Sequence, residues 1–180
     1  MSDTAFIDDI SSRRTQARKH IMNGAVTEGF TQKRETIIKL LNEALATELI
    51  CVLRYKAHYF NANGAGSTMA KEEFLEHADE EQAHADRLAE RISQLGGQPD
   101  FNPETLMKRS HSEYHNKGTT MDMLKEDLIA ERIAIDSYRE MIRFAGEKDP
   151  TTRRILEDIL AQEEEHADDL VDLIEQINDR

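Results

Sequence analysis

The sequence predicts an all-α fold built from four long amphipathic helices. Only eight Gly and three Pro occur among 180 residues, and 33% of the residues are charged, which is typical of long helices with solvated outer faces. In four separate segments, apolar residues recur at the three- and four-residue spacing of one helical face. A hydrophobic content of 38% can build one core, so we expect a single bundle domain.

The first two helices form the first predicted hairpin. The first helix covers about residues 31–61, and turn-forming residues at 61–66 follow it. The second helix opens at Ser67 or Thr68, either of which can serve as an N-cap. It stops before Gly96–Gly97, because glycine readily ends a helix.

The next segment, residues 98–118, is too long for a simple turn between helices. It contains two Pro and several turn formers, so we expect a crossover connection, with a short helix near residues 104–108. His111 and His115 lie in this segment. Solvated loop histidines are the expected interpretation, and lining a channel is the alternative.

The second hairpin repeats the plan of the first. Its first helix begins after Thr119 or Thr120 and ends at Gly146. Asp149–Pro150 then supplies an N-cap followed by Pro at the first helical position, which opens the last helix. Residues 30–180 are therefore expected to form the four-helix bundle.

Residues 1–29 form a polar N-terminal extension with one short helix. Its basic residues are Arg13, Arg14, Arg18 and Lys19. Such residues can contact DNA phosphates, but the net charge of −13 opposes nucleic-acid binding. We therefore expect no DNA partner, and the extension is interpreted as a helical segment that packs on a neighbouring subunit.

Cysteine content and hydropathy narrow the class of protein further. The single cysteine, Cys51, excludes an internal disulfide and any CxxC metal site, and it is interpreted as a small buried hydrophobe. No apolar signal region occurs in the first 30 residues, and there is no run of about 18 apolar residues. A cytoplasmic protein without membrane contact is expected.

Acidic and imidazole side chains interrupt the apolar face of every predicted helix. Glu48, for example, stands between Leu41 and Tyr55, where another apolar side chain would be expected. The inward-facing residues are Glu48 on the first helix, Glu81 and His84 on the second, Glu131 on the third, and Glu163 and His166 on the fourth. Surface carboxylates do not account for this placement.

Their spacing indicates an internal repeat. The motif Glu-x-x-His occurs at residues 81–84 and 163–166, and the lone inward Glu precedes it by 33 and 32 residues. Tyr55 and Tyr138 each follow the lone Glu of their half by seven residues. Two such hairpins could pack about a pseudo-twofold axis, which would bring equivalent ligands together across the bundle.

Four buried carboxylates require compensating cations, because burying even one unpaired charge costs several kcal/mol. Two divalent metals about 3.5 to 4 Å apart satisfy four Glu and two His. Oxygen and imidazole ligands suit iron or manganese, with zinc as a competitor. Each metal would take one His, and the two metals would share bridging carboxylates.

Four further residues lie close to these positions in the sequence. Glu80, Glu164 and Glu165 adjoin the motif residues but fall off the inward face, so they are expected to face solvent or an assembly cavity. His77 lies one turn before Glu81 and could approach the centre. A hydrogen-bonded core or interface histidine is the preferred interpretation of His77.

Residues 31–178 resemble the ferritin-like superfamily, particularly bacterioferritin. The stretch HADRLAERISQLGGQP, which begins at His84, is especially similar. The resemblance implies that Glu48, Glu81, His84, Glu131, Glu163 and His166 form a ferroxidase centre for two Fe(II) ions per subunit. It also implies oxidation by O₂ or H₂O₂, storage of the ferric mineral in a protein shell, and a place for Tyr55 beside the site.

Two departures from bacterioferritin matter, one for haem binding and one for the size of the cage. Gln82 stands where bacterioferritin carries its haem-ligating Met, so we expect no haem. Only 14 residues follow His166, which leaves no room for the fifth helix of the 24-subunit shells. Together with the crossover and the N-terminal extension, this short C-terminal end resembles that of bacterioferritin-related, Dps-like mini-ferritins of twelve subunits. Those proteins often have a pair of cysteines near the metal site, whereas this sequence has only Cys51. The intersubunit site of ordinary Dps proteins has no recognisable motif here.

The predicted function is therefore ferroxidase activity with iron storage and detoxification in a homo-oligomeric cage. In this hypothesis Glu48 and Glu131 act mainly as terminal carboxylates, Glu81 and Glu163 as bridges, and His84 and His166 as one nitrogen ligand for each iron. The first alternative is a non-storing di-metal peroxidase or catalase, similar to rubrerythrin or manganese catalase. The missing CxxC module argues against a complete rubrerythrin arrangement. The second alternative is a purely structural helical assembly, and the inward charges argue against it.

Overall fold

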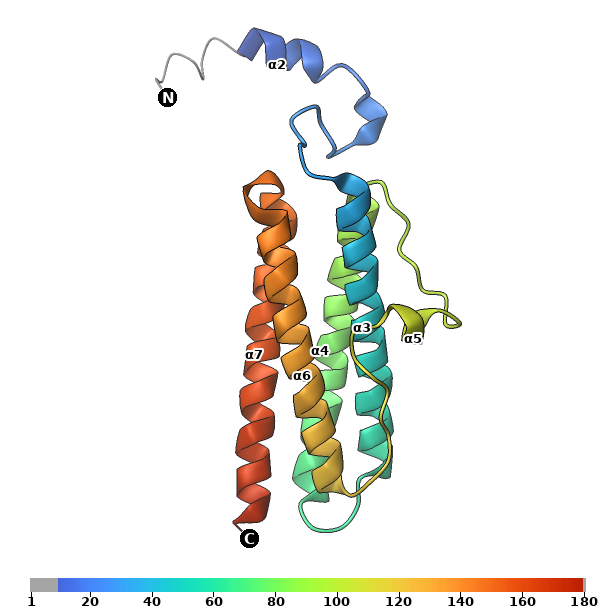
Figure 1. Ribbon diagram of the computed structural model, residues 1–180, viewed down its shortest axis with the longest axis vertical. Coiled ribbons are helices and arrows are strands. Elements are labelled where there is room, and N and C mark those ends of the chain that lie inside the picture. Colours follow the sequence, from blue (N-terminus) through green and yellow to red (C-terminus); the bar gives the residue numbers. More distant parts are fainter. Residues whose placement is uncertain (1–9, 180) are drawn as a thin grey trace.

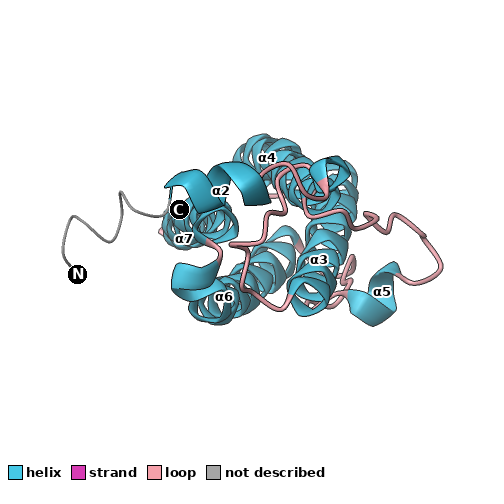
Figure 2. Ribbon diagram, turned by 90° about the horizontal axis from the view of Figure 1, so that it is seen from above, coloured by secondary structure: helices cyan, strands magenta, loops and turns pink. Residues whose placement is uncertain are grey.

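The computed structural model describes residues 10–179, and all regular secondary structure in that range is helical. The first nine residues of the predicted extension, and residue 180, lie outside the described part. Four long helices form the bundle: α3 (Arg34–Asn61), α4 (Ser67–Gln94), α6 (Thr120–Ala145) and α7 (Pro150–Asn178). They run side by side in Figure 1, and Figure 2 shows them end-on. The predicted all-α four-helix bundle is confirmed.

Local capping explains where the helices of the second hairpin begin. The Thr119 side chain accepts a hydrogen bond from the backbone N–H of Asp122, and the Asp122 carboxylate accepts one from the backbone N–H of Thr119. Asp149 accepts a hydrogen bond from the backbone N–H of Thr152, with Pro150 at the first helical position. Such caps satisfy N–H groups that have no partner within the helix. The predicted starts of both helices are confirmed.

The first hairpin differs slightly from its prediction at one end. Helix α3 begins at Arg34, three residues after Thr31, and its N-cap residue Lys33 makes no side-chain cap. Gln32 instead donates a hydrogen bond from Nε2 to the carbonyl oxygen of Phe144, at 2.6 Å. The preceding chain is thus tied to the end of the bundle before the helix starts.

The described part of the N-terminal segment contains two short helices, α2 (Ile10–Gln16) and η1 (Ile21–Asn23). Neither contains a buried residue. Figure 1 places α2 beyond one end of the bundle. Val26 and Phe30 then pack against the core cluster at that end.

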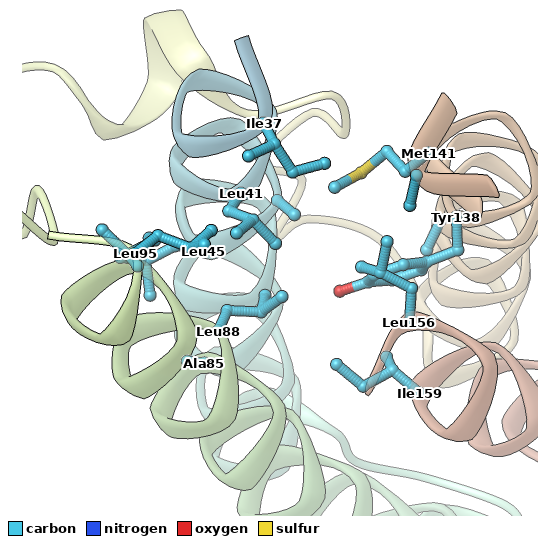
Figure 3. Packing of buried hydrophobic residues seen from close by; sticks show 14 residues of the cluster. Ile37, Leu41, Leu45, Ala85, Leu88, Leu95, Tyr138, Met141, Leu156 and Ile159 are labelled. Atoms are coloured by element: carbon cyan, nitrogen blue, oxygen red, sulfur yellow. The ribbon is translucent and has the colours of Figure 1, made fainter. Parts of the chain in front are cut away.

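The apolar core divides into two clusters along the bundle axis. The first gathers buried side chains such as Leu41, Leu88 and Leu156, and Figure 3 shows residues of α3 and α4 pointing toward those of α6 and α7. The second is built around residues such as Phe74 and Leu124, towards the other end. On every long helix, the predicted inward-facing polar residues lie between its contributions to the two clusters.

The crossover follows the outer side of α3 and contains the short helix α5 (Leu106–Arg109). A fully buried ion-pair cluster holds its last part on the bundle. Arg54 Nε donates to Asp127 Oδ1 at 2.7 Å, and His58 Nδ1 lies 2.7 Å from Asp127 Oδ2. Arg54 and His58 also hydrogen-bond the backbone carbonyls of Glu113 and His115, respectively. None of the described helices has a stretch apolar and long enough to cross a membrane.

Candidate metal centre

All six side chains predicted to face inward meet between the two apolar clusters, and each residue is at most 1% exposed. They form two overlapping groups, and within each group the potential ligand atoms lie within 4.8 Å of one another. One group is Glu48, Glu81, His84 and Glu163, and the other is Glu81, Glu131, Glu163 and His166. Glu81 and Glu163 belong to both groups, which is the position a bridging carboxylate takes.

The His84 ring presents Nδ1 to the centre and Nε2 to its edge. Nδ1 lies 3.1 Å from Glu163, 3.5 Å from Glu81 and 3.6 Å from Glu48. Nε2 lies 3.0 Å from Oε1 of Gln162, an atom that can only accept a hydrogen bond. In the neutral ring, Gln162 therefore fixes the proton on Nε2 and leaves the Nδ1 lone pair facing the carboxylates.

His166 has the same arrangement in the other half. Its Nδ1 lies 3.5 Å from Glu81 and 4.0 Å from Glu131, whereas its Nε2 lies 2.8 Å from Oε2 of Glu80. Metal-ligating histidines usually donate their second ring N–H to a carboxylate or carbonyl, which orients the ring and raises its basicity. Glu80 and Gln162 occupy these supporting positions for the two rings.

Two buried tyrosines support the lone carboxylates across the bundle. Tyr55 on α3 donates its hydroxyl proton to Glu131 on α6, and Tyr138 on α6 donates to Glu48 on α3. Burial raises the pKa of both phenols, and the carboxylate that each one faces raises it further. Both hydroxyls therefore remain protonated donors at neutral pH.

The hydrogen bonds leave many atoms of the centre without a partner. Among the described residues, ten buried side-chain N or O atoms have none, and eight of those belong to the six centre residues. Both oxygens of Glu81 and of Glu163 are in this set, as are the Nδ1 atoms of both histidines. An unsatisfied buried polar atom costs roughly 1–3 kcal/mol, so such a concentration is typical of a ligand site. Divalent cations fit this donor set of oxygen and imidazole nitrogen.

Protonation partly relieves the charge when no metal is bound. Burial raises the pKa of Glu48, Glu131 and Glu163, and the nearby Glu81 carboxylate adds to each increase. Burial also acts to raise the pKa of Glu81, but its contacts with Glu48 and the two histidines lower it below the usual range.

The histidines respond in the opposite direction to burial. Burial acts to lower the pKa of His84, but its contacts with Glu163, Glu48 and Glu81 raise the pKa far above the ordinary value. For His166, burial is likewise outweighed by Glu81 and Glu131, which raise its pKa to about 9. Metal binding must therefore displace protons from the centre.

Sequence reasoning missed two supporting residues and misjudged a third. Gln162 precedes Glu163, and no pattern marks it. The spacing of Tyr138 indicates only the repeat, although its contact with Glu48 is equivalent to that of Tyr55 with Glu131. The prediction that Glu80 faces solvent or an assembly cavity is incomplete. Its side chain is 40% exposed, but it also contacts His166. In the sequence, only the position of Glu80 next to Glu81 indicates a contact with the centre.

The other singled-out residues lie near the centre or away from it. Cys51 is buried against the second core cluster, and its Sγ lies 3.7 Å from Ser112 Oγ. His77 is buried as expected, whereas His111 and His115 are exposed in the crossover. Gln82, at the position of the haem-ligating Met, is exposed and donates a hydrogen bond to Asp86 at 3.0 Å. The absence of haem stays a prediction.

Fold and centre together define the class of ferritin-like, carboxylate-rich helical bundles. The sequence-family model named Ferritin-like domain matches residues 38–179, and the chain belongs to this family. Bacterioferritin from Brucella melitensis is 30% identical over 147 residues, which cover 79% of this chain and 87% of that protein. Bacterioferritin from Streptomyces coelicolor is 31% identical over 147 residues, with coverage of 79% and 84%.

Solved structures show the same fold. The dodecameric thioferritin of Bacteroides fragilis, a bacterioferritin-related protein, is 34% identical with a TM-score of 0.79, and the match covers 82% of this chain and 89% of that one. An archaeal Dps homologue from Halobacterium salinarum is 26% identical with a TM-score of 0.74, with coverage of 78% and 80%. The predicted relationship to bacterioferritin and Dps-like proteins is confirmed.

Proposed function

We propose that this protein is a ferroxidase that stores and detoxifies iron as a mini-ferritin. The observation that carries the proposal is the pair of overlapping ligand groups, which share Glu81 and Glu163 and contain eight buried atoms without a hydrogen-bond partner. Its relatives include bacterioferritins, and the ferritin-like family generally uses such carboxylate sites for iron.

The six residues would bind Fe(II) as a substrate, two ions per subunit. Glu48 with His84, and Glu131 with His166, would each hold one ion, and Glu81 and Glu163 would lie between the two ions. Both histidines would bind through Nδ1, because Gln162 and Glu80 engage the two Nε2 atoms. The hydroxyls of Tyr55 and Tyr138 would hold the terminal carboxylates in place.

The reaction is a transfer of electrons from the bound iron to an oxidant. Each Fe(II) gives up one electron, and two electrons with two protons reduce one H₂O₂ molecule to two water molecules; O₂ is the alternative acceptor. The buried carboxylates favour this reaction, because negative charge stabilises Fe(III) more than Fe(II) in a site of low dielectric constant. Consuming Fe(II) together with peroxide would limit hydroxyl-radical formation.

A cage of twelve subunits is the proposed assembly. Its support is the likeness to a dodecameric, bacterioferritin-related protein over most of both chains. A closed homo-oligomeric shell would retain the ferric product, whereas an isolated bundle would retain only the ions in its centre. A cytoplasmic location is part of the same proposal.

The test combines oxidation, retention and particle mass. Metal-free protein is loaded anaerobically with Fe(II), then given O₂ or H₂O₂ in separate samples. We expect rapid oxidation, many iron ions retained per subunit, and a dodecameric mass by light scattering. A monomer or dimer that oxidises iron but retains only two ions per chain would support the non-storing peroxidase or catalase alternative instead. A cage that does not accelerate oxidation would refute the ferroxidase assignment.

A matched pair of double variants tests the site itself. Glu81→Gln with Glu163→Gln removes both shared carboxylates while preserving their size. Glu72→Gln with Glu165→Gln removes the same charge from exposed positions of the same two helices. We expect rapid oxidation to be lost in the first variant and kept in the second. Rapid oxidation in the first variant would show that the centre is assigned wrongly.

A further inference from the structure

A second cluster of potential ligands lies beside the centre, between α4 and α7. Its members are Glu73, His77 and Asp169, whose ligand atoms lie within 4.8 Å of one another. His77 Nε2 lies 2.9 Å from Glu73 Oε1 and 3.9 Å from Asp169 Oδ2. We propose that these three residues bind a third divalent cation.

The buried nitrogen of His77 is the first argument for a cation. His77 is only 1% exposed, and its Nε2 is one of the buried atoms without an aligned hydrogen-bond partner. Two ligands of one ion, each about 2.0–2.2 Å from it, lie no more than about 4.4 Å apart. The separations of Nε2 from both carboxylates fall within this limit. The nitrogen is therefore directed toward a position where both carboxylates can share an ion with it.

The hydrogen bond on the other side of the ring sets the tautomer of His77. Tyr55 has one phenolic proton and donates it to Glu131. Its oxygen can therefore only accept from His77 Nδ1, which lies 3.2 Å away. In the neutral ring the proton is then on Nδ1, and the Nε2 lone pair faces Glu73 and Asp169. This is the arrangement of a metal-ligating histidine with its second nitrogen anchored.

The ligand atoms of these three residues lie within 4.8 Å of one another, and a positive charge between them would stabilise them. One imidazole nitrogen and two carboxylates suit Fe(II), Mn(II), Co(II) or Zn(II). The side chains of Glu73 and Asp169 are 25% and 50% exposed, so water can complete the coordination and ions can enter from solvent. A doubly protonated His77 paired with Glu73 is the other way to satisfy these atoms, and it leaves no third cation site.

The internal repeat provides a comparison within the same chain. The proposed ligands lie eight and four residues before Glu81 and three residues after His166. The equivalent positions of the other half are Ile155, Ile159 and Arg87. There the position corresponding to His77 is filled by an isoleucine that is fully buried in the apolar core. The bundle therefore does not need a histidine at this position for packing, and the polar cluster is a property of one half only.

The third site adjoins the dinuclear centre directly. The ring of His77 stacks on the ring of His166, with centroids 4.1 Å apart and planes 23° apart. Glu80 contacts His166, and His77, Glu80 and His166 form another group of close potential ligands. The third site shares His77 with this group, and this group shares His166 with the centre. The groups therefore form a continuous series from the exposed Asp169 to the buried centre. We infer that the third site holds Fe(II) before the ion passes to the dinuclear centre. This role rests on the proposed ferroxidase function, whereas the binding of a cation at the third site does not.

The binding test uses Co(II), which does not require oxidation. Metal-free full-length protein is titrated anaerobically with Co(II), and bound cobalt is counted by calorimetry and visible absorption. We expect three Co(II) per chain in the wild type and two in Glu73→Gln with Asp169→Asn. The control, Glu72→Gln with Asp172→Asn, removes equal charge from exposed positions on the same helices and should still bind three. Two Co(II) in the wild type, or three in the site variant, would overturn the proposal.

Iron oxidation separates the transfer role from the function of the centre. At Fe(II) concentrations below the number of centres, oxidation by the site variant should be slowed at least about tenfold, because capture of the ion is weakened. With Fe(II) in excess, its rate should approach that of the wild type. Equal rates at low Fe(II) would refute the transfer role. A wild type that binds three Co(II) but oxidises no Fe(II) would refute the ferroxidase function and leave the third site standing.

Discussion

The hydroxyl of Tyr138 donates a hydrogen bond to Oε1 of Glu48, although the two residues lie 90 positions apart. The pair connects α6 to α3, and Tyr55 makes the reciprocal contact with Glu131, 76 positions away. Each half of the repeat therefore orients the lone carboxylate of the other half. Since both contacts are buried, the geometry of each proposed terminal ligand depends on correct packing between the two hairpins.

Tyr138→Phe should weaken metal binding without disrupting the bundle. The change removes one hydroxyl and leaves Glu48 Oε1 without its donor. Residues that support metal ligands typically contribute a factor of about 10–100 to metal affinity. Anaerobic Co(II) titration should show this loss mainly in one of the two ions of the centre. Tyr114→Phe alters a half-exposed tyrosine in the crossover and serves as the control, with affinity unchanged. Equal affinities in both variants would contradict the supporting role.

Substituting a shared carboxylate should weaken the binding of two ions, whereas substituting a terminal carboxylate should weaken the binding of one. Glu81 belongs to both ligand groups, whereas Glu48 belongs to one. Glu48→Gln should therefore leave one ion bound with near-normal affinity, while Glu81→Gln should weaken both ions. Counting bound Co(II) at a fixed free concentration distinguishes the two cases. Glu165→Gln, at an exposed position of α7, should bind as the wild type does. Loss of only one ion in Glu81→Gln would show that this residue does not bridge.

The fold and the six inward residues could be predicted because they depend on short-range pattern. Helical periodicity and capping residues determine where the four helices lie along the chain. A charged residue inside an apolar stripe must face the core, and this pattern identifies Glu48 and Glu131. The duplicated Glu-x-x-His spacing then related the two halves.

The contacts of Asp127 and Gln162 could not be predicted, because they join helices at positions that no periodicity relates. Asp127 lies one turn before Glu131 on the buried face, but its partners Arg54 and His58 come from α3. The pairing depends on how the two helices are rotated and shifted against each other. Gln162 likewise meets His84 only through packing of α7 against α4.

The metal-free protein should lose stability as pH rises. Burial and neighbouring carboxylates raise the pKa of Glu48, Glu131 and Glu163, and carboxylate contacts raise that of both histidines. A group whose pKa is raised by folding stabilises the folded state below its unfolded pKa, about 4.3 for Glu and 6.5 for His. That stabilisation is lost as pH rises through the folded pKa, which is about 9 for His166. Glu81, with its lowered pKa, acts in the opposite direction.

Thermal unfolding of chelator-treated protein between pH 6 and pH 9 measures this effect. We expect the melting temperature to fall across that range. Glu163→Gln should flatten the dependence, because it removes one buried acid and a main contact of His84. Glu165→Gln should retain the slope of the wild type. Bound metal should also flatten it, since the ions replace the protons. A melting temperature that rises with pH in the metal-free wild type would contradict the assigned shifts.

Asp127 should contribute strongly to the free energy of unfolding, although it is not one of the proposed metal ligands. Its carboxylate is fully buried and contacts both Arg54 and His58, which hold the end of the crossover through two backbone carbonyls. Asp127→Asn leaves the Arg54 charge buried without its partner, and such a loss costs about 3–5 kcal/mol.

The measurement is thermal unfolding together with amide hydrogen exchange of residues 110–118. Asp127→Asn should lower the melting temperature and speed exchange in that segment, because the anchoring side chains lose their geometry. Asp79→Asn breaks the exposed ion pair with Lys56, which has an N–O distance of 2.8 Å, and should cost no more than about 1 kcal/mol. Crossover exchange should stay unchanged in that control. Exposed ion pairs gain little over hydration, whereas breaking a buried pair leaves an uncompensated charge. Equal effects of the two substitutions would therefore contradict the anchoring role of Asp127.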